Sequence, residues 1–159
     1  MWKSTVPAAL AALVAMHQAA PALAGVEIID GPPQEGSGAS EGIAFGWNPN
    51  EDVDAVEATV GNLDLAGVPR DERYTIHASL TVINGGDGTP AGKTAALVAA
   101  RERAGDLLAA VGDVLAADGT LRGTVTAAAL NDCNWRQDDT DRGMLARVNF
   151  SLTVRAFIR

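Results

Sequence analysis

The stretch MLARVNFSLTVRAFI, residues Met144 to Ile158, decides the fold of this chain. Every second side chain in it is apolar, and the side chains between them are mostly polar. Because successive side chains of a β-strand point to opposite faces, the pattern predicts a long strand with one apolar and one polar face. Such a strand is typical of an antiparallel sheet that has helices on its apolar face only. The apolar set is Met144, Ala146, Val148, Phe150, Leu152, Val154, Ala156 and Ile158.

The rest of the chain supplies partners for this strand. Alternating side chains over residues 73–83 predict a second long strand. Helical periodicity occurs twice, in a segment that starts near Val6 and stops before Pro21, and over residues 91–117. Shorter strand-like runs occupy residues 26–29, 43–47, 55–65 and 123–130. The order predicts a single domain, residues 1–159, of the α+β class, with a mixed, mostly antiparallel sheet and two main helices packed on one face.

Three polar segments are expected to be loops. Residues 34–42 (QEGSGASEG) and 48–54 (NPNEDVD) have the composition of flexible, exposed connections. The acidic turn 48–54 lacks the central glycine and the closing glutamate of a calcium-binding loop, so we expect no metal there. Residues 131–143 (NDCNWRQDDTDRG) are predicted to form a polar loop before the final strand.

The composition argues against several classes of protein. The 159 residues carry a net charge of −8, which disfavours a broad basic face that grips nucleic acid. It leaves open a protein past which DNA slides without being held. Cys133 is the one cysteine, so the chain has neither an internal disulfide nor a cysteine-based zinc site. We interpret Cys133 as a small residue near a strand rather than as a reactive thiol.

The segment GGDGTPAGKT, residues 85–94, partly matches the phosphate-binding loop of nucleotide hydrolases, G-x-x-x-x-G-K-[ST]. Asp87 stands where the first glycine belongs, and its carboxylate would repel phosphates. Pro90 removes one of the backbone N–H donors. The preceding strand alternates apolar and polar side chains, whereas the strands of such loops are continuously apolar. A turn followed by a helix with Thr89 as its N-cap explains the segment better.

The first 25 residues allow two interpretations. A basic start, an apolar centre and the small-x-small motif Ala22–Ala24 are typical of a secretory signal. The alternative is an amphipathic helix, because apolar residues recur at the spacing of one buried helical face. The polar pair His17-Gln18 interrupts the apolar run, which favours the helix and makes the run too short to span a bilayer. The residues of that face are Val6, Leu10, Leu13 and Val14.

No catalytic constellation is visible in the sequence, and we expect neither an enzyme nor a cofactor or metal site. His17 and His77 lack neighbours typical of a metal ligand or a general base. The acidic pairs 51–52 and 138–139 fall in predicted turns. No segment combines a nucleophile, a base and oxyanion donors. The sequence therefore favours a binding or structural module.

The expected binding surface combines the polar face of the last strand with segment 131–143. Trp135 beside Arg136 pairs two side chains that are enriched at interface hot spots, although Trp135 is equally well explained as an anchor that folds back on its own chain. The polar face of the last strand suits a subunit contact or a water-filled lumen. The interface candidates are Trp135, Arg136, Asp138, Asp139, Arg142, Arg147 and Arg155.

Four stretches carry a resemblance to a known family. They are APALAGVEIIDGPP, DERYTIHASLTVINGGD, AALVAARERAGDLLAAVGDVLAADGTL and RGMLARVNFSLTVRAFIR. In this order they resemble the tail terminator (tail completion) proteins of long-tailed bacteriophages, with the fold of the lambda-like minor tail protein U. The likeness covers nearly the whole chain as a pattern, and it carries over no catalytic motif and no residue-level site.

The resemblance implies a structural virion protein that forms a ring, usually of six subunits. Such a ring caps the tail tube at full length and joins it to the head connector, with DNA passing through the lumen without specific binding. The implied partners are other copies of the chain, the tail tube protein and a connector or head-completion protein, and no membrane. The implied location is the head-proximal end of the virion tail, after assembly in the host cytoplasm. We hypothesise that segments 31–42 and 131–143 contact the tube or the connector.

Three alternatives stay open from the sequence. The nearest is another phage ring component, a head-completion or tail tube protein, because these also form rings from antiparallel sheets. A nucleotide-binding enzyme would lose affinity for ATP or GTP on Lys93→Ala. A secreted binding domain would have a mature chain that starts near Gly25.

Overall fold

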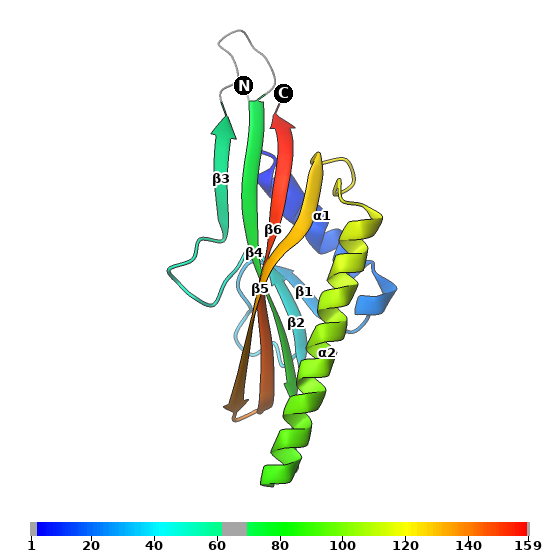
Figure 1. Cartoon of the computed structure of the whole chain (residues 1–159), viewed down its shortest axis with the longest axis vertical. Coiled ribbons are helices and arrows are strands. Elements are labelled where there is room, and N and C mark those ends of the chain that lie inside the picture. Colours follow the sequence, from blue (N-terminus) through cyan, green and yellow to red (C-terminus); the bar gives the residue numbers. More distant parts are fainter. Residues whose placement is uncertain (1–2, 62–69, 159) are drawn as a thin grey trace.

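The computed structural model describes residues 3–61 and 70–158, which form six strands and two α-helices of the α+β class. The strands make one mixed, mostly antiparallel sheet, in the order β1-β2-β4-β6-β5, with β3 paired to β4 as well. Both helices pack on one side of this sheet (Figure 1). The elements are α1 (Val6–Gln18), the 3-10 helix η1 (Pro21–Leu23), β1 (Glu27–Asp30), β2 (Glu41–Phe45), β3 (Val56–Gly61), β4 (Arg70–Asn84), α2 (Pro90–Ala117), β5 (Ala127–Thr140) and β6 (Gly143–Ile158).

The two long strands form the centre of the sheet. β4 and β6 pair antiparallel from Arg70↔Ile158 to Asn84↔Met144 without a break in register. The predicted alternation of β6 is confirmed, because its even-numbered residues from Ala146 to Ile158 are all buried. They face α2, whose small residues Ala100 and Ala104 let the helix lie close to the sheet. The class, the order of elements and the side on which the helices lie were thus predicted correctly.

The N-terminal segment belongs to the core. Ala9 and Leu13 of α1 are fully buried, and Leu23 of η1 is nearly so. The carboxylate of Glu72 in β4 accepts hydrogen bonds from Ser4 Oγ (2.6 Å), Thr5 N (2.9 Å) and Thr5 Oγ1 (2.7 Å), and so anchors the start of α1 to the sheet. The helix predicted here is confirmed. A chain that starts near Gly25 would lose these core side chains, which counts against the secretory-signal interpretation.

The loop predicted over residues 131–143 was wrong. β5 continues to Thr140 and pairs with β6 as a hairpin, with a two-residue turn at Asp141-Arg142 and a β-bulge between Leu130 and Cys133. The segment is a strand because β6 offers it a free backbone edge, not because its side chains have strand periodicity. Residues 131–139 are exposed on both faces, so they show no apolar alternation.

Several predicted boundaries also move. The strand expected over 123–130 begins at Ala127, because the carboxylate of Asp118 holds the preceding residues in a turn by accepting from Thr120 N (3.0 Å) and Arg122 N (2.9 Å). Glu41 and Gly42, expected in the loop 34–42, belong to β2 and pair with β4. Residues 62–65 of the strand expected over 55–65 lie outside the described residues.

Two glycines make a matched test of the hairpin and of α2. Gly143 has φ +132°, and a Cβ there would lie 2.6 Å from the carbonyl oxygen of Asn84, so we expect Gly143→Ala to destabilise the protein by about 1–3 kcal/mol. Gly105 lies in α2, where a Cβ would meet only Trp135 Cη2 at 3.9 Å. Gly105→Ala should therefore stabilise the protein by about 0.5–1 kcal/mol. Urea unfolding measures both, and equal effects of one sign would contradict the described packing.

His17 is a buried titratable group in the core. Its Nδ1 lies 2.7 Å from the carbonyl oxygen of Leu13, its ring packs on Phe45 at 4.7 Å, and Nε2 has no hydrogen-bond partner among the described residues. Burial lowers the pKa of His17 below its ordinary value of 6.5, against the opposing effect of the Leu13 carbonyl. The folded protein therefore holds this side chain neutral.

We expect His17 to make folding acid-sensitive. Below pH 6.5 the unfolded chain binds a proton at His17 while the folded chain does not, so the free energy of unfolding falls as the pH falls further. His17→Leu should flatten this part of the stability profile, measured by urea unfolding between pH 7.5 and 5. His77→Gln is the control, because His77 is partly exposed and lies 3.2 Å from Glu57. An unchanged acid slope in His17→Leu would contradict the assignment.

Candidate interaction surface

The outermost strand β5 is the most exposed part of the sheet. It pairs with β6 on one edge only, and every residue from 131 to 139 is exposed. Its partner β6 is buried along most of its length. An edge strand of this length with open N–H and C=O groups is a surface that other chains can cover.

The two sides of β5 carry different candidates. Asp139 and Trp135 lie on the side of α2, and Arg136 and Asp138 lie on the helix-free face, as their pairing with β6 requires. Asp139 Oδ2 accepts from Lys93 Nζ at 2.7 Å, which ties the hairpin to the first turns of α2. The structure thus separates these four residues, which the sequence placed in one loop.

Trp135 combines the two roles proposed for it. Its ring reaches back toward Gly105 of α2, as an anchor would. It still leaves 41% of its surface exposed, and Val98, about two turns before Gly105 on the same side of α2, is 37% exposed. An aromatic side chain that is both held in place and exposed is typical of an interface residue.

The tip of the hairpin contacts a distant loop. Arg142 Nη2 donates to the carbonyl oxygens of Gly38 (3.0 Å) and Ala39 (3.3 Å). This contact brings segments 31–42 and 131–143 together, although they lie far apart in the sequence. The sequence indicated both segments but not the contact between them, because the acceptors are backbone carbonyl groups, which every residue carries.

Arg147 lies opposite another arginine and forms no ion pair in the described chain. It pairs directly with Arg136 across β6 and β5, and its Nε is buried without an acceptor among the described residues. Burial lowers the pKa of Arg147 from its ordinary range, Arg136 lowers it further, and Asp138 acts in the opposite direction. Asp138 forms no ion pair with either arginine in the described chain.

Arg155 lies in a similar pair that is neutralised. It is directly opposite Arg73 on β4, and Asp71 lies between them, 2.9 Å from Arg73 Nε and 3.3 Å from Arg155 Nε. Arg155 also lies 5.5 Å from the ring centroid of Phe157. Burial raises the pKa of Asp71, but hydrogen bonds from Arg73 and Arg155 outweigh it and the pKa is lowered. Asp71 was not among the sequence candidates.

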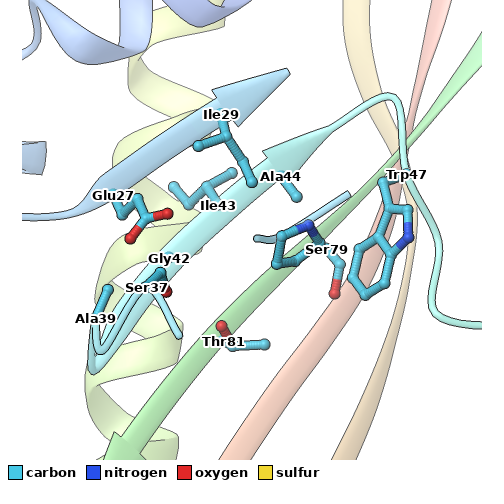
Figure 2. A pocket seen from close by; sticks show the side chains of 11 residues that line it. Glu27, Ile29, Ser37, Ala39, Gly42, Ile43, Ala44, Trp47, Ser79 and Thr81 are labelled. Carbon is cyan, nitrogen blue, oxygen red and sulfur yellow. The ribbon is translucent and has the colours of Figure 1, made fainter. Parts of the chain in front are cut away.

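Two small hollows lie on the helix-free side. The first, about 50 Å³, lies under segment 33–39 against β1, β2 and β4, with Trp47 and Ser79 at one end and Glu27 and Ala39 at the other (Figure 2). The second, about 190 Å³, is lined mainly by residues with polar side chains. Both are below the size of a typical small-molecule site. The second is lined by Asn48, Val53, His77, Asp132, Asn134, Asn149, Phe150 and Ser151.

In the segment that partly matches a P-loop, the carboxylate of Asp87 lies where a phosphate would bind. Asp87 Oδ1 accepts from Thr89 N (2.9 Å) and Thr89 Oγ1 (2.6 Å), and the carboxylate lies directly against Gly92. The hydrogen bonds from Thr89 lower the pKa of Asp87, so the charge stays in place. A phosphate at this helix start would meet that charge, which argues against the nucleotide-binding interpretation.

Within residues 3–61 and 70–158, His, Cys, Asp and Glu do not gather in a group of three or more that suits a metal ion. Neither helix of the described chain has the length and apolarity needed to cross a bilayer. Cys133 is a free, exposed residue of β5.

The fold is similar to that of a known virion chain. A chain in the structure of the virion of a native gene transfer agent (GTA) particle superposes with a TM-score of 0.55. The two share 18% sequence identity, and the match covers 93% of each chain. At this identity the likeness shows a shared fold. No family model and no curated protein sequence matches the chain.

Proposed function

We propose that this protein is a structural virion protein, a tail terminator. Its copies close into a ring, of six members as the resemblance implies, that caps the completed tail tube and joins it to the head connector. DNA passes through the lumen. In this proposal the protein acts by binding and is not an enzyme, and it lies at the head-proximal end of the tail after assembly in the host cytoplasm.

The exposed edge strand is the observation that carries this proposal. Residues 131–139 of β5 have both faces and one backbone edge uncovered, whereas β4 and β6 are paired on both edges and covered by helices on one face. A ring of identical copies needs such a surface, because each copy must present one patch to the next. The shared fold with a chain of a GTA virion supports the same class of function.

The hairpin tip is the proposed contact with the tube or connector. Arg142 joins the turn at 141–142 to the loop around Gly38, so both hypothesised segments form one end of the molecule. In Figure 1 this end lies beside the start of α2, away from the chain's C-terminus. The net charge of −8 suits a lumen through which DNA moves without being held.

The nearest alternative is another ring component of the same particle, a head-completion or tail tube protein. The following experiment distinguishes a tail terminator from these proteins. Tubes assembled from the tube protein of the same genome would be incubated with this protein and imaged by electron microscopy. We expect a ring at one end of each tube and no further growth. Tubes that keep growing uncapped, or a protein that itself polymerises into tubes, would contradict the terminator.

Charge reversal at the tip sharpens this test. Arg142→Glu should reduce capped tubes by about tenfold, because it removes the contact with Gly38 and reverses the charge of the docking end. Arg122→Glu is the matched control, since Arg122 is exposed and lies beyond the opposite end of α2. Equal capping by the two variants would contradict the docking role of the tip.

A further inference from the structure

We propose that the arginine pair Arg136/Arg147 binds the acidic outer ridge of α2, Glu102 and Asp106, on the next copy of the chain. The proposal deepens the ring proposed above and rests on it. The contact joins the helix-free face of one copy to the helix side of its neighbour. Such a contact between two different patches is heterologous, as a ring requires.

The same sheet shows what an arginine pair needs. Arg73 and Arg155 are directly opposite on adjacent strands, and Asp71 lies between them and bonds both. Arg136 and Arg147 are also directly opposite, yet neither forms an ion pair with a carboxylate of the described chain, and Arg147 Nε has no acceptor there. Like charges directly opposite each other destabilise a sheet. Asp138 of the same chain lies near Arg147 but forms no ion pair with either arginine, so a carboxylate from outside the chain would do for this pair what Asp71 does for the other.

The outer ridge of α2 has the complementary chemistry. Glu102, Asp106 and Asp113 are exposed and follow one another at helical spacing on the side opposite the buried Ala104 and Leu107. The same exposed side of α2 carries alanine at positions 95, 109 and 116, which allows close approach.

The arginines of α2 form no ion pair with this ridge, although the charge of Arg103 lies near Asp106. Arg103 makes a two-pronged ion pair with Glu41 of β2, at 2.8 Å and 3.0 Å. Arg101 turns toward Gln137 of β5 at 3.4 Å. Both are thus directed to the flanks of the helix, and the outer carboxylates are left for another partner.

The spacings of the two groups match. Directly opposite side chains on adjacent strands have Cβ atoms about 5 Å apart. Residues four apart on a helix have Cβ atoms about 5–6 Å apart. Arg136 and Arg147 can therefore meet Glu102 and Asp106 one to one. Within a single copy the two pairs lie on opposite layers, so only a second copy can join them.

Two charge-reversed variants test the contact. Arg136→Glu/Arg147→Glu makes both patches acidic, and Glu102→Arg/Asp106→Arg makes both basic. Each variant alone should self-associate at least about tenfold more weakly than the unmodified chain, measured by sedimentation and native mass spectrometry. A 1:1 mixture should regain oligomers in which the two variants alternate, because each patch then meets its opposite charge. This recovery also shows that both variants fold.

The control variant is Lys3→Glu/Arg122→Glu, at two exposed residues, which changes the net charge as much as the first variant but leaves the proposed contact intact. It should associate like the unmodified chain. Reversed variants that associate normally, a mixture that does not recover, or an equal loss in the control would overturn the contact while leaving the ring itself standing. Normal association with loss of double-stranded DNA retention in Arg136→Glu/Arg147→Glu would overturn it in favour of a nucleic-acid site. An unmodified chain that never associates contradicts the ring proposed above.

Discussion

The antiparallel pairing of β4 with β6 is the constraint on which the rest of the structure depends. It runs unbroken from Arg70↔Ile158 to Asn84↔Met144 and places alternate residues of both strands on opposite faces. A slip of one residue would exchange the two faces, so the apolar set of β6 fixes the register. The helices α1 and α2 cover the apolar face, β5 pairs with the edge of β6 that β4 leaves open, and the polar residues of β6 lie on the helix-free face.

The sequence was sufficient where side chains report burial. The alternation over 144–158 and over 73–83, the stripe of α2 and the spacing of Val6, Leu10 and Leu13 all predicted elements that the structure contains. It was insufficient where backbone pairing alone decides. Residues 131–140 carry no apolar alternation, and they are a strand because β6 has an open edge beside them.

The sequence proposes a set of interface residues but not their arrangement. Trp135 is partly exposed and also reaches back toward Gly105, whereas Asp139 bonds Lys93 within the same chain and Arg155 shares Asp71 with Arg73. Contacts between segments far apart in the sequence decide which of these charged side chains form ion pairs within the described chain and which do not. That separation makes Arg136 and Arg147 stand out, since they lack the carboxylate that the other arginine pair possesses. A surface with uncompensated charges on an exposed edge strand is consistent with a protein that acts by assembly.

The most direct test of the central claim is native mass spectrometry of the full-length protein at high concentration, with and without ATP. The proposed ring predicts a closed multiple of the intact chain mass, six-fold for the family it resembles, with no nucleotide adduct. A monomer that carries ATP, or a stable chain that begins near Gly25, would contradict the account.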